Sequence, residues 1–358
     1  MIRLTKLAAI GLLSAAVAAP SSLFADSAKN VSLKTAMAFS AAQPGAGSNI
    51  RWAASRVEAA SNGSLKLRLF EPDKLVAPFE ILDAVSSGKV EAGYSSASLW
   101  AGKMPASRLF STVPFGPEAG EFLAWLWHGN GAALYQGMYD QAGYDVKVLV
   151  CGILPPKSAG WFAKEVNQAA DLRELNMRFF GIGGDVMRKL GVSVRPMAGS
   201  EIISAVEKVA IEAVEYSTPE MDRKLGIHKH LKINYFPGWH QQASMLELLI
   251  NKAVWNNMHV SRQLLLDTVC RAASANSFAE GEASQYRAMQ ENTTKDGVTI
   301  RNWSSELLAM FEKSWQEVAR EQAAADPYFK KVWEDLSAFR ADYAIWRRNA
   351  FLPRAGSN

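Results

Sequence analysis

The segment LNMRFFGIGGDVMRKL, residues 175–190, decides the fold of this chain. Its apolar first part, residues 175–180, predicts a short strand that carries one cation, Arg178. The glycines within residues 181–184 predict a turn, and residues 185–190 have the apolar spacing of an amphipathic helix. A strand, a turn and a helix in this order are typical of an α/β fold.

Arg178 is the most informative single residue of this segment. Burying a cation inside an apolar strand costs free energy unless the cation meets an anion. The planar guanidinium group suits a carboxylate, because the two groups can form a pair of parallel hydrogen bonds. Arg178 therefore predicts a carboxylate site, and the alternative is an internal ion pair with an aspartate or glutamate of the same chain.

The N-terminal residues 1–25 have the pattern of a secretory signal peptide. Arg3 and Lys6 precede a short apolar run at residues 7–19, and Ala25 offers a small residue for cleavage. The apolar run is too short for a comfortable membrane span, although a retained N-terminal anchor is the alternative. We therefore expect the mature chain outside the cytoplasm.

Length and composition indicate the class of protein. Removal of the signal peptide leaves about 330 of the 358 residues, enough for two lobes of ordinary domain size. The chain is 49% hydrophobic and 21% charged, which is typical of a globular protein. The formal net charge is only +4, and no basic cluster suits a phosphate backbone, so we expect no nucleic-acid partner.

The two cysteines, Cys151 and Cys270, lie in apolar sequence contexts. Because such cysteines are often buried as free thiols, the sequence favours two free thiols, although an oxidising compartment would permit a disulfide. The sequence contains no CxxC motif and no His/Cys cluster, which argues against a zinc site.

Strand and helix signals alternate along the first part of the chain. Strands are expected at residues 31–39, 65–70, 90–94, 145–150, 160–163, 175–180, 192–196 and 211–216. Helices are expected at residues 45–61, 78–86, 185–190 and 200–208. This order predicts a mostly parallel sheet with helices on both faces. The C-terminal third predicts helices at residues 252–277, 282–292, 304–325 and 327–350.

These elements divide the mature chain into four parts. Residues 26–150 are expected to form mainly the first lobe and residues 151–250 mainly the second. Residues 251–326 would supply helices that bridge and complete the lobes, and residues 327–358 would form the last helix. Its apolar stripe consists of Trp333, Leu336, Phe339, Tyr343 and Trp346. This stripe packs on its own lobe or on a second subunit, so the helix is a candidate dimerisation element.

Lys157 and Glu215 lie near the ends of expected strands, as Arg178 does. In open α/β sheets, ligands bind beyond the carboxyl ends of the strands, so these three side chains are candidates for one binding site. The alternatives are a solvated Lys157 and a Glu215 that only pairs with Arg178. The glycines after Arg178 lack the G-x-G-x-x-G spacing of a dinucleotide site, and they would allow the backbone to approach a small ligand closely.

Several short motifs, taken together and in order, resemble one protein family. They are Val113-Pro114-Phe115-Gly116, Gly160-Trp161-Phe162, Asp171-Leu172-Arg173-Glu174-Leu175-Asn176-Met177-Arg178, Leu190-Gly191, Glu201-Ile202, Ala210-Ile211-Glu212-Ala213, Glu215-Tyr216, Pro237-Gly238-Trp239-His240 and Leu246-Glu247-Leu248-Leu249-Ile250-Asn251. By these motifs the chain resembles the periplasmic solute receptors of TRAP transporters, the DctP-like proteins. It is most similar to the subgroup that binds 2-oxo acids such as pyruvate.

The resemblance implies a periplasmic-binding-protein-like fold: two α/β lobes with mixed sheets, bridged by long helices, with the ligand in the cleft between them. It implies that Arg178 binds the carboxylate of a small organic acid, which the protein delivers to membrane permease subunits. Tyr216, Trp161 and Phe180 are expected to form walls of the pocket. Several members of the subgroup form dimers through the C-terminal helix, so we expect a homodimer. The alternative is an enzyme acting on a carboxylate substrate, with Lys157 as a reactive amine.

The chain departs from the subgroup at the place where a cation, Na⁺ or Ca²⁺, bridges ligand and protein. A glutamine ligand of that cation corresponds to Lys157, and a glutamate after the Pro-Gly-Trp-His motif corresponds to Gln241. Both replacements oppose metal binding, because a cation needs anionic or carbonyl oxygens. We therefore expect no metal cofactor and propose that the Lys157 ammonium replaces the cation. Glu215 is retained and would be a metal ligand only if the cation is kept.

The far wall of the site also departs from the subgroup. The aromatic residue expected just before Trp100 is replaced by Ser98 and Leu99. A tryptophan expected near the first helix is replaced by Gln43. Smaller or more polar walls would admit a different side group, so the ligand need not be pyruvate.

Overall fold

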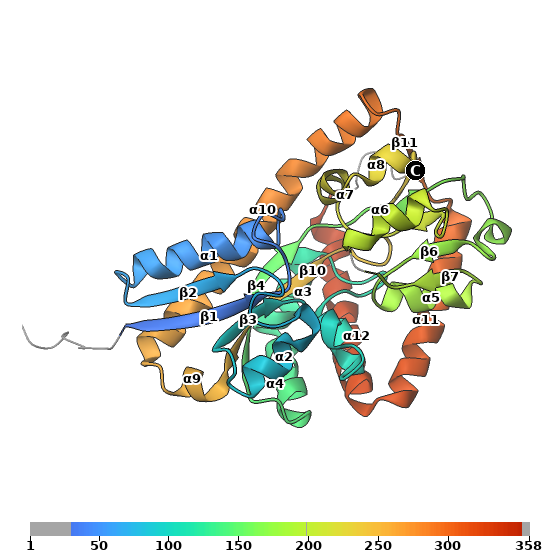
Figure 1. Ribbon diagram of the computed structural model, residues 1–358. Coiled ribbons are helices and arrows are strands. Elements are labelled where there is room, and N and C mark those ends of the chain that lie inside the picture. The colour runs from blue at the N-terminus through green and yellow to red at the C-terminus, as the bar shows by residue number, and fades with distance from the viewer. Residues whose placement is uncertain (1–29, 198, 353–358) are drawn as a thin grey trace, which may run out of the picture.

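Two mixed β-sheets, each with its own helices, form two lobes that are joined by long helices (Figure 1). The computed structural model describes residues 30–197 and 199–352, so the expected signal peptide at residues 1–25 lies outside the described residues. The first sheet lies on the left of Figure 1, and strands β6 and β7 of the second sheet lie on the right. This arrangement confirms the predicted two-lobed α/β fold with mixed sheets.

The first sheet has the strand order β2-β1-β3-β10-β4. Its strands are β1 (Val31–Met37), β2 (Leu65–Phe70), β3 (Ala92–Ser95), β4 (Val146–Leu154) and β10 (Ser244–Asn251). Strand β1 is parallel to β2 and β3, as the sequence predicts, whereas β10 is antiparallel to β3 and β4. The chain therefore returns to the first sheet at β10, within the residues expected to form mainly the second lobe.

The second sheet has the strand order β11-β9-β5-β8-β6-β7. Its strands are β5 (Gly160–Phe162), β6 (Asn176–Arg178), β7 (Ser193–Arg195), β8 (Ala213–Val214), β9 (Ile233–Phe236) and β11 (Thr299–Asn302). Strand β6 is parallel to β7 and β8, while β5 is antiparallel to β8 and β9. The expectation of mostly parallel sheets is thus wrong around β10 and β5, each of which is antiparallel to both of its neighbours.

Helices cover both sheets. The first lobe carries α1 (Gly47–Ala60), α2 (Ile81–Ser86), α3 (Ala119–His128) and α4 (Gly131–Gln141), and the second carries α5 (Ile182–Lys189), α6 (Gly199–Glu207), α7 (Pro219–Leu225) and α8 (Ile227–His230). The C-terminal helices are α9 (Lys252–Asn256), α10 (Val260–Thr294), α11 (Ser305–Ala325) and α12 (Pro327–Ala350). Short 3₁₀ helices are η1 (Pro78–Glu80), η2 (Ala97–Trp100), η3 (Pro105–Phe110) and η4 (Ala169–Leu172).

Helix α10 is one continuous helix of 35 residues, where the sequence predicts two helices separated at residues 278–281. Gly281 does not end it. A Cβ atom at Gly281 would lie 2.5 Å from Cδ of Pro155, so glycine is needed there for close packing rather than for a break. The helix contacts β4 of the first lobe and α7 of the second, and it therefore connects both lobes (Figure 1).

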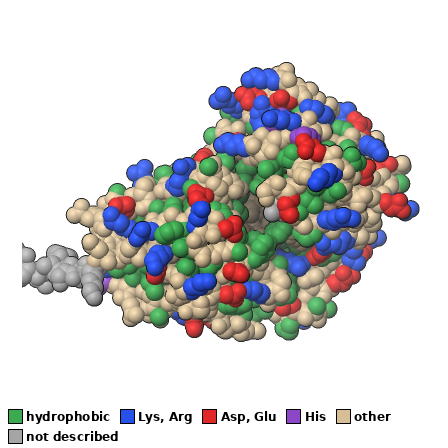
Figure 2. Space-filling model, in the orientation of Figure 1, with side chains coloured by type: hydrophobic (Ala, Val, Ile, Leu, Met, Phe, Trp, Pro, Cys, Tyr) green, Lys and Arg blue, Asp and Glu red, His purple; other side chains and the backbone are tan. Residues whose placement is uncertain are grey.

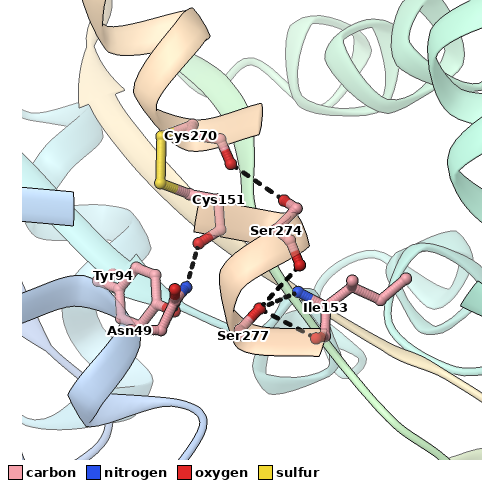
Figure 3. Close-up of a disulfide and its surroundings, with 7 residues drawn as sticks. All are labelled: Asn49, Tyr94, Cys151, Ile153, Cys270, Ser274 and Ser277. Atoms are coloured by element: carbon pink, nitrogen blue, oxygen red, sulfur yellow. Dashed lines mark hydrogen bonds between the residues drawn. A yellow bond between two sulfur atoms is a disulfide. The ribbon is translucent and has the colours of Figure 1, made fainter. Parts of the chain in front are cut away.

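Cys151 and Cys270 form a disulfide, so the prediction of two free thiols is wrong. The bond joins β4 to α10, which lie next to each other in the core of the first lobe (Figure 3). The cysteines are 119 residues apart in the sequence, and only the packing of α10 against β4 brings them together. Their apolar surroundings, which favoured free thiols, are equally compatible with a buried disulfide.

Helix α12 packs its first half on its own lobe. Phe329, Val332 and Leu336 are buried there, and Trp333 packs edge to face on Trp315 with ring centroids 5.2 Å apart. The apolar stripe predicted for this helix is therefore largely intramolecular. The last turns of α12 do not share this packing: the apolar side chains near the C-terminal end of the helix are exposed to solvent.

Within residues 30–197 and 199–352, no helix combines the length and the apolar character that a membrane crossing requires.

Candidate functional site

A cavity of about 620 Å³ lies between the two lobes. Figure 2 shows a hollow ringed by hydrophobic side chains in the middle of the molecule, between its left and right parts. The first lobe lines the cavity with Phe39, Gln43, Ser96, Ser98, Leu99 and Ser111, and the second lobe with Arg178, Phe180, Met197 and Tyr216. Lys157 and Gln241, from segments that connect the lobes, also line it.

Arg178, at the end of β6, is only 6% exposed and is held by the second lobe. Its Nη1 lies 2.9 Å from Oε2 of Glu215 and also donates to the Glu215 backbone carbonyl, while Nε donates to the Met197 carbonyl at 3.3 Å. Within the described part of the chain, Nη2 has no protein partner. Arg178 thus forms the internal ion pair of the alternative prediction and still presents free N–H groups to the cavity.

Glu215 is the anion around which the cations gather. It is 1% exposed, and its carboxylate accepts from Lys157 Nζ at 3.1 Å, Arg178 Nη1 at 2.9 Å and the Phe180 backbone N–H at 3.2 Å. Burial would raise its pKa, but Lys157, His240 and Arg178 outweigh burial and hold the pKa of Glu215 well below its ordinary value. Glu215 is therefore ionised throughout the neutral range.

His240 is the fourth member of this group, and its Nε2 lies 3.4 Å from Oε1 of Glu215. Burial lowers the pKa of His240; the neighbouring Glu215 opposes this shift, but burial, with the cations Lys157 and Arg178, outweighs it. With a neutral imidazole, two cations face one carboxylate, and the cluster of Lys157, Arg178 and Glu215 carries a net charge of about +1. Such a cluster is balanced by a ligand with one negative charge.

Lys157 lies at the base of the cavity, and its side chain is 16% exposed. Its Nζ donates to Oε1 of Glu215 at 3.1 Å and to the backbone carbonyl of Tyr216 at 2.9 Å. An ammonium group has three N–H donors, so one donor remains for a ligand in the cavity.

The residues around Nζ do not suit a resident metal ion. A hard cation binds carboxylate and carbonyl oxygens, and the two such oxygens here, Glu215 Oε1 and Tyr216 O, both accept from the Lys157 ammonium. Across the described residues, no group of three or more His, Cys, Asp and Glu side chains could hold a metal ion. The two oxygens that a metal ion would need are therefore already bonded to the Lys157 ammonium group.

The structure brings most of the predicted site residues to one cavity. The predicted residues that line it are Arg178, Lys157, Tyr216, Phe180, Gln241, Gln43 and Ser98. Glu215 lies behind this wall and contacts the two cations.

Trp161 does not line the cavity, so its predicted role as a wall is wrong. The indole is fully buried in the core of the second lobe, and its Nε1 donates to Oδ2 of Asp222 at 2.7 Å. Met197 and Tyr216, which line the cavity, pack against the core cluster that contains Trp161, so the indole lies behind the cavity wall.

Two functional neighbours were not predicted, His240 and Asp222. His240 follows Trp239 in the Pro-Gly-Trp-His motif, so proximity to Gln241 was the available signal. Asp222 accepts from Trp161 and from the Ser217 backbone, and burial, only partly opposed by these bonds, raises its pKa to about 7. Nothing in its sequence context, at the start of a short helix, distinguishes it from a surface aspartate.

Residues 40–326 match the DctP family model, described as bacterial extracellular solute-binding protein, family 7. Over 295 residues the chain is 34% identical to a monocarboxylate 2-oxoacid-binding periplasmic protein of Nostoc sp. PCC 7120, covering 82% of this chain and 80% of that protein. This match and the family model extend over both lobes and the cavity between them.

Solved structures agree with this similarity. A TRAP transporter solute-binding protein of Bordetella bronchiseptica, a dimer with calcium and picolinate in one site, shares 27% identity with a TM-score of 0.85, covering 90% of this chain and 95% of that one. A TRAP periplasmic solute-binding protein of Pseudoalteromonas atlantica, with bound sodium and pyruvate, shares 27% identity with a TM-score of 0.84, covering 90% and 97%.

Proposed function

Because the chain belongs to the DctP family of bacterial extracellular solute-binding proteins, we propose that it captures a small 2-oxo monocarboxylate such as pyruvate through Arg178. It is the solute receptor of a TRAP transporter, and its solutes are small organic acids. We infer one carboxylate and a 2-oxo group in the ligand from the residues that line the cavity.

The net charge of the cluster formed by Lys157, Arg178 and Glu215 is the observation that carries the proposal. Lys157 and Arg178 bring two positive charges to the one negative charge of Glu215, and both cations have unused N–H donors that face the cavity. One carboxylate balances the remaining charge, and a keto oxygen, which only accepts hydrogen bonds, suits the donors that remain. The apolar side chains around them favour a ligand with few other charges.

The Lys157 ammonium takes the place that a metal ion has in related proteins. The related protein of Bordetella bronchiseptica holds calcium with picolinate, and that of Pseudoalteromonas atlantica holds sodium with pyruvate. In this chain Nζ donates to a carboxylate oxygen and a backbone carbonyl, the kinds of oxygen that would coordinate such an ion. The site therefore needs no metal ion to neutralise the ligand.

The alternative of an enzyme with Lys157 as a reactive amine is not supported. The family and the relatives are binding proteins of transporters. In addition, Nζ of Lys157 is held by Glu215 Oε1 at 3.1 Å and by the Tyr216 carbonyl at 2.9 Å, whereas a Schiff-base lysine needs a nitrogen that is free to attack the carbonyl carbon of its substrate.

Titration calorimetry of residues 26–358 with pyruvate tests the proposed function. We expect saturable binding to the unaltered protein and a loss of at least about 100-fold in affinity for Arg178→Ala, because the ligand carboxylate would lose the charge-assisted hydrogen bonds of Nη2 and would be left buried without a partner. Arg173→Ala, at an exposed arginine of the same segment, is the matched control and should bind as the unaltered protein does. Absence of binding for every small monocarboxylate, or full affinity in Arg178→Ala, would contradict the proposal.

Export and dimer formation complete the proposed function. Residues 1–25 would direct export to the periplasm, and mass spectrometry of the secreted protein should find an N-terminus at or near Asp26. Near the end of α12, Ile345 and Trp346 are 60% and 61% exposed, and a second copy of the chain would cover them. Light scattering should give the mass of a dimer, and the double variant Ile345→Glu with Trp346→Glu should give a monomer.

A further inference from the structure

The wall of the cavity that belongs to the first lobe carries a chain of three serine hydroxyls. The Oγ of Ser96 lies 3.1 Å from that of Ser98 and 2.8 Å from that of Ser111. All three residues line the cavity, although Ser96 and Ser111 are only 7% and 2% exposed. These hydroxyls face the same space as Arg178 from the opposite lobe.

The hydroxyl chain has hydrogen-bonding capacity that the protein does not use. Three hydroxyls have three O–H donors, and the two bonds between them use two, so one donor and several acceptor lone pairs remain. The Ser244 hydroxyl also belongs to a residue that lines the cavity, and it has no hydrogen-bond partner among the described residues. A polar group of the ligand would be needed to satisfy these hydroxyls once the cavity closes.

Gln241 is a second and independent observation at the same place. It is 3% exposed and lines the cavity, yet its Nε2 has no hydrogen-bond partner. Its backbone carbonyl accepts from the Lys157 N–H at 3.3 Å, and the preceding residue, His240, accepts from the Thr112 hydroxyl. The backbone at residues 240–241 is therefore bonded both to Lys157 of the cationic cluster and to Thr112, which follows Ser111.

Buried hydrogen bonds fix the segment that carries Ser96 and Ser98. Glu247, which is fully buried, accepts from the Ser95 hydroxyl at 2.9 Å and from the Trp100 indole at 2.8 Å. These two donors stand on either side of residues 96–99, so the segment that carries Ser96 and Ser98 is fixed before any ligand arrives. A subsite of this kind loses little conformational entropy on binding.

The charge on this wall limits the chemistry of the ligand. The residues before Lys157 that line the cavity are uncharged, so no cation there would balance a second carboxylate. An alkyl group would leave the hydroxyls and the Gln241 amide buried without partners. A neutral group that both donates and accepts hydrogen bonds fits this wall.

We infer that Ser96, Ser98 and Ser111, together with Gln241, form a second subsite that binds a hydroxyl group of the ligand. The preferred ligand is then a short 2-oxo monocarboxylate with a hydroxyl at carbon 3 or 4, whose carboxylate is bound by Arg178. This inference rests on the proposed function and adds to it the identity of the side group.

Matched pairs of ligands test the inference by calorimetry. 3-Hydroxypyruvate is compared with 2-oxobutanoate, and 4-hydroxy-2-oxobutanoate with 2-oxopentanoate, because within each pair a hydroxyl replaces a methyl group of similar size. In at least one pair we expect the hydroxylated acid to bind about 3- to 15-fold more tightly, the gain of one or two net hydrogen bonds. Pyruvate serves as the probe for the carboxylate and keto positions.

A variant shows whether the serines cause this preference. In the double variant Ser98→Ala with Ser111→Ala, the ratio of the two affinities should fall to within about twofold of one. In Ser55→Ala, an exposed serine on α1, the ratio should stay as in the unaltered protein. A ratio does not depend on the fraction of active protein, so partial misfolding of a variant does not obscure the result.

Each remaining outcome overturns the inference. If pyruvate binds and neither hydroxylated acid binds more tightly than its methyl partner, the hydroxyls serve only one another, and the proposed function stands without the second subsite. A preference that persists in the double serine variant places the source of selectivity elsewhere. If pyruvate and all four acids fail to bind, the proposed function fails, and the inference fails with it.

Discussion

Replacing Lys157 by glutamine removes the ammonium group that, in the proposed function, replaces a metal ion. The substitution removes one charge-assisted hydrogen bond to the ligand and reduces the net charge of the cluster from about +1 to about zero, because Arg178 and Glu215 remain. A hydrogen bond to a charged group contributes about 1.5–3 kcal/mol, which corresponds to about 10- to 150-fold in affinity. We therefore expect pyruvate to bind that much more weakly to Lys157→Gln in cation-free buffer.

Added cations should reverse much of this loss. In Lys157→Gln the new amide oxygen, Glu215 Oε1 and the Tyr216 carbonyl would offer three oxygens to an ion at the position of the former ammonium. Millimolar calcium or sodium should then recover most of the lost affinity. Lys157→Met, which has no oxygen to offer, should lose affinity similarly and gain little from either ion.

Calorimetry in buffers with EDTA, with calcium and with sodium measures these affinities. Lys164→Gln is the control, because the Lys164 side chain is 86% exposed and should not influence binding. The reasoning is refuted if Lys157→Gln binds pyruvate as tightly as the unaltered protein without added ions. Equal rescue of Lys157→Met and Lys157→Gln would also refute the proposed coordination.

Three further predictions concern stability. Asp222 has a pKa raised by burial to about 7, above its unfolded value of about 4, so its contribution to stability is complete below pH 4 and is lost as pH rises to about 7. In chemical denaturation, the free energy of unfolding of Asp222→Asn, relative to that of the unaltered protein, should therefore increase by up to about 4 kcal/mol between pH 4 and pH 8. A constant difference would contradict this. Replacing both cysteines of the disulfide by serine should lower the free energy of unfolding by about 2–5 kcal/mol with little change in pyruvate affinity; a loss below about 1 kcal/mol would contradict the expected constraint. Gly281→Ala should destabilise by about 1–3 kcal/mol because its Cβ would meet Pro155, whereas the open helical site Gly120→Ala should be neutral or stabilising, and equal effects would be unexpected.

Local signals in the sequence were sufficient for the overall class of fold. The strand at residues 65–70 and the helix at residues 327–350 have the predicted limits, because alternating and helical apolar patterns reflect one buried face each. Strand β10 was missed for the opposite reason: all eight of its residues are buried, so it shows no alternation. The order of strands within each sheet depends on packing between distant segments, which no local pattern reports.

The candidate site was predictable where a residue was costly to bury. Arg178 in an apolar strand and Lys157 in place of an uncharged residue both predicted a charged cavity, and both line it. Trp161 was misplaced because a large aromatic side chain suits a core as well as a pocket wall, and only its complete burial in the folded protein distinguishes them. The disulfide was missed because its geometry requires the three-dimensional approach of β4 and α10.

The most direct test of the account is the affinity of the unaltered protein for pyruvate with and without metal ions. Calorimetry is performed in a buffer with EDTA and an organic cation in place of sodium, and again with calcium or sodium restored, while elemental analysis measures the metal content of the protein. With the Lys157 ammonium in the position of the cation, the affinity should change by less than about twofold and the protein should hold no stoichiometric metal. A loss of about tenfold or more on removal of cations, reversed by calcium or sodium, would contradict the central claim.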